Sequence, residues 1–187
     1  MANTSATELR RIALEQFARF GFAGASLGSI AEAAGLTKSS VLYHYSSKEA
    51  LLAAAVEPAI DRLAEVIDGY LGGPLSPAFV EQFVDLLLAH RLELHVFINQ
   101  GQSLNDIPVI QRANALIQRL GEAATDHIPT TRDRIRFGIA LGGAAYVLVA
   151  TANWSNEPFD DIDEIRAALV DSITTLLADM SVGSASH

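Results

Sequence analysis

The stretch SLGSIAEAAGLTKSSVLYHYSSKEAL, residues 26–51, holds the strongest structural signal of the chain. Ser26 can cap a helix over Leu27–Ala34, because a serine hydroxyl accepts a hydrogen bond from an amide of the first turn, and the glycine that follows can end it. A second helix follows over Lys38–Tyr45, with Thr37 as its cap. Two short helices joined by a tight, glycine-containing turn form the helix-turn-helix motif, whose second helix enters the major groove of DNA. The stretch therefore predicts a DNA-binding element.

The second of these helices has two different sides. At 100° per residue, Val41 and Tyr45 fall together and are expected to pack inward, while Tyr43 points away from them. Around Tyr43 the helix carries Ser39 and Ser40 beside it, His44 at the margin, and Lys38 and Leu42 on the other flank. Hydroxyls and an exposed aromatic on so short a helix suit a groove better than a core. The alternative is an ordinary surface of a helical bundle.

The same stretch resembles the DNA-binding signature of TetR-family regulators. The resemblance rests on the pair Ile30-Ala31, the turn Ala34-Gly35-Leu36-Thr37, the following Lys38, the run Tyr43-His44-Tyr45, and Lys48 three residues after that run. It covers about residues 7–52. One position departs from the pattern, since Leu42 stands where the family usually has a tyrosine that reaches a phosphate. Tyr43 and His44 are the alternative sources of that contact.

The resemblance implies a transcriptional regulator, in the commoner mode a repressor, that binds a palindromic operator as a homodimer and is released by a small-molecule effector. It implies an all-α fold with a DNA-binding head over residues 1–48 and a helical ligand-binding and dimerisation bundle over residues 49–187. It also implies which residues contact DNA. Ser26 and Lys48 are placed on the DNA backbone, and the residues that face the operator are Thr37, Lys38, Ser39, Ser40, Tyr43 and His44.

Charge and composition agree with this division. The net charge is −9, but residues 1–48 hold five basic and three acidic side chains, a balance of +2, and the remainder carries −11. A mildly basic head on an acidic body suits the placing of one end against phosphates. There is no cysteine, which excludes disulfides and thiolate sites and fits a reducing cytoplasm. We expect a soluble protein without a secretory signal, because Met1–Thr7 is polar and the longest uncharged apolar run, Phe137–Ala150, is shorter than the roughly 20 residues of a membrane span.

Nearly all the rest of the chain shows helical spacing, and no alternating strand pattern appears. The first helix opens at a capping box, Ser5–Glu8, and ends at Gly21; the fourth opens at a second capping box, Ser46–Glu49, and meets Pro58, which should kink or divide it. Further helices are predicted, after the break Gly72-Gly73-Pro74, over Pro77–Asn99, Ile107–Thr125, Thr131–Asn153 and Ile162–Met180.

The last two helices predict a dimer. Phe137–Ala150 is apolar all round and so needs cover on every side, and its glycines would let another helix approach closely. In the last helix one apolar stripe is formed by Ile162, Ile165, Leu169, Ile173, Leu176 and Met180. That stripe could face its own core, or it could join its symmetry mate in a four-helix seam.

An effector pocket is expected in the middle helices, among residues that combine aromatic and polar groups: Phe83, His90, Phe97, Asn114, Tyr146 and Trp154. The acidic body slightly favours a neutral or cationic ligand. No metal or cofactor is predicted, since His90 and His95 are five residues apart and do not share a helix face. A DNA-binding dimer without a small-molecule effector remains an alternative. An all-helical enzyme is a weaker one, because the sequence carries no nucleophile–base motif, phosphate-binding glycine loop or metal spacing.

Overall fold

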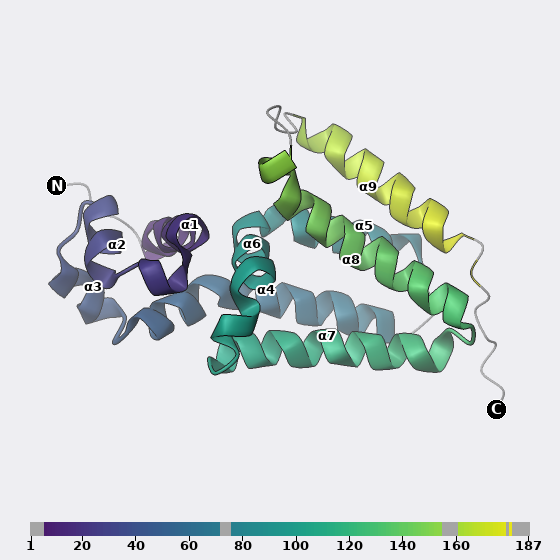
Figure 1. The fold of residues 1–187 in the computed structure, drawn as a ribbon, viewed down its shortest axis with the longest axis horizontal. Coiled ribbons are helices and arrows are strands. Elements are labelled where there is room, and N and C mark those ends of the chain that lie inside the picture. The colour runs from purple at the N-terminus through teal and green to yellow at the C-terminus, as the bar shows by residue number, and fades with distance from the viewer. Residues whose placement is uncertain (1–5, 72–75, 155–160, 179, 181–187) are drawn as a thin grey trace. The chain divides into compact units, whose positions relative to one another are not determined.

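A computed structural model describes residues 6–71, 76–154, 161–178 and 180. Within these residues all regular structure is helical, which confirms the all-α class expected from the sequence (Figure 1). The elements are α1 (Ala6–Gly24), α2 (Leu27–Ala33), α3 (Lys38–His44), α4 (Lys48–Leu71), α5 (Pro77–Ala89), α6 (Arg91–Gln100), the 3-10 helix η1 (Gly101–Leu104), α7 (Pro108–His127), α8 (Thr131–Trp154) and α9 (Ile162–Leu177).

The chain forms two compact units. The first consists of Met1–Ile60 and Leu92–Arg112, and the second of Asp61–Arg91 and Ala113–His187. The predicted division into a DNA-binding head, residues 1–48, and a ligand-binding body, residues 49–187, does not coincide with these units. It stays a prediction, and residues 48 and 49 both lie in the first turn of α4.

The first unit has its own apolar core. Its α1 packs on α2, and α2 packs on α3. The side chains of Leu9, Phe17, Ile30, Val41 and Leu51 are fully buried there. Burying an apolar side chain of this size contributes about 1.5–3 kcal/mol. The helical spacing of these residues in the sequence thus accounts for the way in which α1, α2 and α3 meet.

The second unit is held by α5, α8 and α9, each of which packs on the other two. An aromatic cluster joins α4, α5 and α8: the ring of Tyr70 lies 5.0 Å from that of Phe79 and 6.0 Å from that of Phe137, centroid to centroid. Burial in this cluster raises the pKa of the Tyr70 hydroxyl. At the surface, Arg166 of α9 donates from Nε to a carboxylate oxygen of Asp85 on α5, at 2.6 Å.

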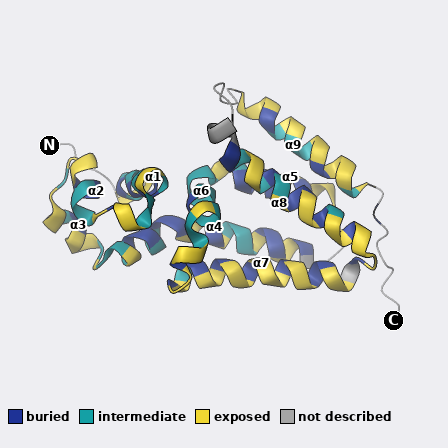
Figure 2. Cartoon of the chain, viewed as in Figure 1, coloured by how far each residue is buried: buried dark blue, intermediate teal, exposed yellow. Residues whose placement is uncertain are grey.

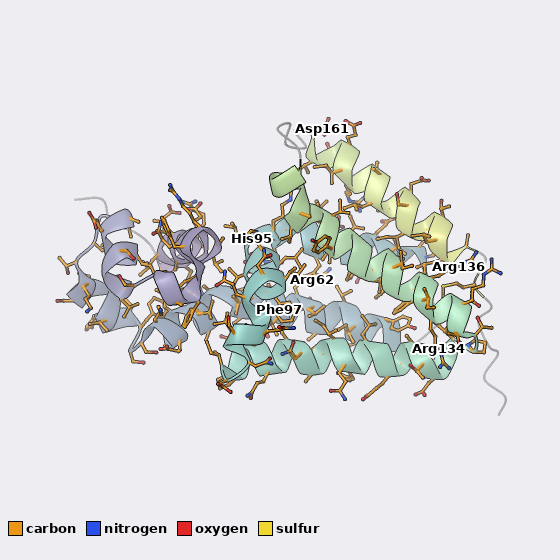
Figure 3. All side chains as sticks on the ribbon, viewed as in Figure 1. Arg62, His95, Phe97, Arg134, Arg136 and Asp161 are labelled. Carbon is orange, nitrogen blue, oxygen red and sulfur yellow. The ribbon has the colours of Figure 1, made fainter. Side chains whose placement is uncertain are left out.

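The turn between α7 and α8 is closed by reciprocal polar contacts. The Thr130 hydroxyl donates to the buried carboxylate of Asp133 at 2.8 Å and accepts from the Asp133 amide at 3.1 Å, so the two residues cap α8. Arg134 reaches back from α8 and donates to the carbonyl oxygens of Ile128 and Thr125, at 2.8 and 3.0 Å (Figure 3). One of the last carbonyls of α7, that of Thr125, thereby gains a partner.

The prediction of a single helix over Pro77–Asn99 is wrong. Two helices, α5 and α6, occupy this range, because His90 leaves the helical region with φ −123° and ψ 42° while its amide still closes the last turn of α5 on the Leu86 carbonyl. Neither proline nor glycine marks the break, so local sequence carried no signal for it.

The start of α4 also differs from expectation by one residue. The Ser47 hydroxyl, not that of Ser46, accepts the hydrogen bond from the Ala50 amide, at 3.1 Å. The backbone amide of Glu49 itself and the Ser47 hydroxyl, which both bond to the Glu49 carboxylate, hold the pKa of that carboxyl below its usual range. The helix then continues through Pro58 as one element. The predicted first capping box cannot be compared, since Ser5 lies outside the described residues.

Burial follows the helical period along most elements, as the alternating colours along α7 show (Figure 2). None of the described helices combines the length and apolar character that crossing a membrane requires.

Candidate nucleic-acid interface

Capping chemistry fixes the two helices of the motif. The Ser26 hydroxyl accepts from the Ser29 amide at 3.0 Å, and the Ser29 hydroxyl accepts from the Ser26 amide at 3.0 Å, which is a reciprocal capping box. At the other end of α2, Gly35 adopts φ 68°, a conformation that a residue with a side chain rarely takes. The Gly35 and Leu36 amides then donate to the carbonyls of Glu32 and Ala31, at 3.0 and 2.8 Å. This pair of bonds is the Schellman motif, which ends α2 and turns the chain into α3.

The two sides of α3 differ as the sequence predicts. Val41 is 0% exposed and anchors the helix to the core of the first unit. Tyr43 is 86% exposed, and its ring meets that of His44 edge-on at 5.3 Å. The outward orientation of Tyr43 is therefore confirmed. Lys38, Ser39 and His44 are exposed as well, and Ser40 is half-buried.

The hydroxyls of α3 are not equivalent. Thr37 Oγ1 accepts from the Ser40 amide at 3.1 Å and lies 2.8 Å from Ser40 Oγ, so both groups take part in the helix start. Ser39 has no protein partner among the residues that the structure describes. Because α3 contains no acidic residue, its exposed side offers Lys38 and hydroxyl donors to an anionic partner. Leu42, 43% exposed, adds an apolar group to the same surface.

Lys48 lies in a more constrained place than Lys38. Its ammonium donates to the carbonyl oxygens of Phe22 and Ala25, at 2.5 and 2.9 Å, and lies 4.3 Å from the centre of the Phe22 ring. Two of its three donors thus satisfy the end of α1, where carbonyls lack helical partners. The remaining donor is what Lys48 can offer to a phosphate.

One contact of the first unit had no sequence signal. Gly21 bends α1 with φ 74° and ψ 158°, and next to this bend the side chain of Gln100, from the end of α6, bonds in both directions. Its Oε1 accepts from the Phe22 amide at 2.6 Å, and its Nε2 donates to the Phe17 carbonyl at 2.9 Å. Because Gln100 is 78 residues away from Phe22 in the chain, no local pattern could have indicated the pair.

The six residues predicted for an effector pocket lie in varied surroundings. Phe83 is buried in the second unit and stacks on Phe79 at 6.1 Å. Asn114 and Tyr146 are exposed on α7 and α8, whereas His90 and Phe97 are half-buried. The side chain of Trp154 lies outside the described part. The pocket assignment stays a prediction. Within the described residues, no cluster of three or more histidines and carboxylates is placed to hold a metal ion.

One side of α8 is apolar and uncovered. Ile135 and Ile139 are 56% and 57% exposed, and Tyr146 continues the same side. A Cβ atom added at Gly138 or Gly142 would meet nothing within 4 Å, so packing inside this chain does not require glycine there. The expectation that α8 needs cover on every side is therefore not met within one chain.

These features define a class: helix-turn-helix proteins of the DNA-binding type, with an all-helical body. A family model described as bacterial regulatory proteins, tetR family, matches residues 9–55. The match covers the N-terminal part of the chain, which contains the helix-turn-helix motif.

Individual proteins that are similar to this chain are also transcriptional regulators by name. The HTH-type transcriptional regulator RutR of Escherichia coli (strain K12) is 43% identical over 74 residues, which make up 40% of this chain and 31% of RutR; the chain thus matches about a third of that relative's length. The HTH-type transcriptional repressor SCO4008 of Streptomyces coelicolor is 26% identical over 147 residues, 76% of this chain and 73% of that protein. In fold, the chain is similar to the ketosteroid transcriptional regulator KstR2 of Mycobacterium tuberculosis, with a TM-score of 0.70, 14% identity and 98% of each chain covered.

Proposed function

We propose that this protein is a transcriptional regulator that binds a palindromic operator as a homodimer and is released from it by a small-molecule effector. The observation that carries the proposal is the exposed side of α3, where Tyr43 stands 86% exposed opposite the fully buried Val41. We propose repression as the mode of transcriptional control. The proposed location is the cytoplasm, because it holds the DNA of bacteria.

In this proposal α3 enters the major groove. Ser39 and Lys38 read base edges together with Thr37, Ser40, Tyr43 and His44, since hydroxyl and ammonium groups donate to the acceptors of the groove. Ser26 and Lys48 contact the DNA backbone. Leu42, exposed where related proteins usually carry tyrosine, offers a methyl contact to thymine in place of the phosphate contact.

The dimer seam is proposed on α8 and α9. Ile135 and Ile139 form an exposed apolar strip on α8 beside two glycines, and Ile162 of α9 is 56% exposed. Helices can approach closely over glycine, and an exposed apolar strip of this kind is stabilised when a second copy covers it. A monomeric mass at micromolar concentration would overturn this part of the proposal.

Regulation is proposed to work by a shift of populations. An effector that binds more tightly to a conformation whose recognition helices do not match successive major grooves, about 34 Å apart, would lower operator affinity. A compound with equal affinity for the free and the operator-bound protein could not act in this way.

The test is selection of bound DNA from a random pool with the full chain, followed by binding measurements by fluorescence anisotropy. We expect a palindromic sequence, and a loss of affinity of roughly ten-fold or more for the double variant Ser39→Ala, Tyr43→Ala, because direct groove contacts are removed. Thr174→Ala, on an exposed position of α9, is the matched control and should bind like the unchanged protein. Failure to enrich any sequence, or equal affinity of the double variant and the control, would contradict DNA binding through α3.

A further inference from the structure

Arg91 is the first residue of α6 and follows directly on the non-helical His90. Its side-chain atoms Nε and Nη2 are buried, and neither has a hydrogen-bond partner among the described residues. Buried polar groups nearly always have a partner, and a buried charge without one is expensive. Arg91 is therefore an exception that needs a physical explanation.

Four other arginines of the second unit have partners for their guanidinium groups. Arg62, Arg119 and Arg166 each pair with a carboxylate at the surface, at 2.7, 2.9 and 2.6 Å. Arg134 satisfies two backbone carbonyls. The unit thus supplies partners for these four arginines, yet supplies none for the buried Nε and Nη2 atoms of Arg91.

The two unpartnered atoms are the particular pair that recognises a carboxylate. Nε and Nη2 lie side by side on one edge of the planar guanidinium group and direct two parallel N–H bonds outward, which matches the two oxygens of a carboxylate. A cation would leave this edge unsatisfied, and a neutral amide would offer it one uncharged oxygen in place of two charged ones. The local chemistry is therefore opposite to the overall acidity of the body, which by itself favours a neutral or cationic ligand.

We propose that Arg91 binds the carboxylate of an effector whose remaining part is apolar. The inference deepens the proposed function, on which its regulatory meaning rests. The apolar part is argued from α5, which leads directly to Arg91 and buries Phe83, Leu86 and Leu87 in its last two turns. A carboxylate gives the guanidinium its missing partner, and the apolar body gains from removal from water.

The first experiment compares matched ligands on the full-length protein. The probes are straight-chain carboxylates from butanoate to dodecanoate and 3-phenylpropanoate, each with its neutral amide, at constant ionic strength. At least one acid should raise the melting temperature and bind in calorimetric titration, while its amide should bind about 10–100-fold more weakly, since the amide lacks the charge and one of the two acceptor oxygens. If no acid binds better than its amide, the proposal is wrong.

Variants tie this preference to Arg91. Arg91→Gln should abolish the difference between acid and amide, and Arg91→Lys, which keeps the charge but loses the two-pronged geometry, should restore it only in part. Arg19→Gln, at an exposed arginine of α1, is the control and should keep the full preference. An unchanged preference in Arg91→Gln would overturn the proposal.

A second readout needs no ligand. Arg91→Met exchanges a partly buried guanidinium, two of whose nitrogens lack partners, for an apolar side chain of similar length, so the free protein should melt about 2–4 °C higher. A lower melting temperature would show that other groups already satisfy the guanidinium, and would overturn the proposal.

Operator binding separates this inference from the proposed function. If the Arg91 variants bind the selected operator normally and carboxylates have no Arg91-dependent effect, the ligand site is wrong and the regulator stands. If no operator is bound although carboxylates stabilise the protein through Arg91, the site stands and the proposed function fails.

Discussion

The contact between Gln100 and the bend of α1 gives a sharp test of how the first unit is held together. Gln100→Met keeps the length of the side chain and removes both its donor and its acceptor. The Phe22 amide, bonded to Oε1 at 2.6 Å, and the Phe17 carbonyl, bonded to Nε2 at 2.9 Å, each lose a part-buried partner. The structure thus identifies two bonds, from one side chain, that a single substitution removes.

The expected loss is about 2 kcal/mol. A hydrogen bond contributes about 0.5–1.5 kcal/mol net, and a buried group left without a partner costs about 1–3 kcal/mol. Two groups lose a partner, and each is assigned about 1 kcal/mol, the lower end of the cost for an unpartnered buried group. The lower end applies because both bonds are part-buried and water can replace some of the lost interaction. For a chain of this length, 2 kcal/mol corresponds to a fall in melting temperature of about 4–8 °C.

The assay is urea and thermal unfolding followed by circular dichroism, at one fixed protein concentration because the proposed dimerisation would raise apparent stability. Hydrogen exchange of the Phe22 amide reports the local effect, and its protection should fall more than that of amides in the second unit. Gln118→Met is the matched control, since the Gln118 side chain bonds only to Glu122 at an exposed site among its recorded contacts. A loss below about 0.5 kcal/mol, or one equal to that of the control, would refute the reasoning.

Four further outcomes are expected. Lys48→Ala should weaken binding to all DNA sequences, lower the slope of log affinity against log salt by about one unit, and also destabilise the end of α1; unchanged affinity and slope would remove Lys48 from the interface. Ser39→Ala should alter the preferred operator sequence with little change in stability, which repeated selection from a random pool would detect. Ile139→Asp should give a monomeric mass in sedimentation, because a charge would replace an exposed apolar group at the proposed seam; a dimer of unchanged affinity would place the seam elsewhere. Asp85 has a pKa held below its usual range by the Arg166 guanidinium, so its small contribution to stability is present at neutral pH and is lost as the pH falls through that lowered pKa; Asp85→Asn should therefore destabilise at pH 7 and have no effect in strong acid.

Local chemistry made the head of this protein predictable. A capping serine before α2, a glycine after it and a threonine before α3 each act over three or four residues, so they can be recognised in the sequence. The orientation of Tyr43 followed from the burial of Val41, two positions away on the same short helix. These features depend on sequence neighbours and on helix geometry alone.

Features that depend on distant partners could not be predicted in the same way. The break at His90 has no local breaker, and Gln100 meets α1 across a long sequence separation. The burial of Nε and Nη2 of Arg91 is likewise a property of the assembled unit, because the sequence around Arg91 reads as the interior of one continuous helix. The remaining error is the cap of α4, which was predicted at Ser46 and lies at Ser47. It arose because two adjacent serines are equivalent candidates for the cap.

The start of α3 limits how the DNA preference of this protein could be redesigned. Thr37 and Ser40 contact each other through hydroxyl and amide groups. A substitution at either position would therefore loosen the start of α3 as well as alter the proposed DNA contacts. Lys38, Ser39 and Leu42 are exposed and take no part in that cap. A library meant to retarget the protein to a new operator should vary these three positions and leave the threonine–serine pair intact.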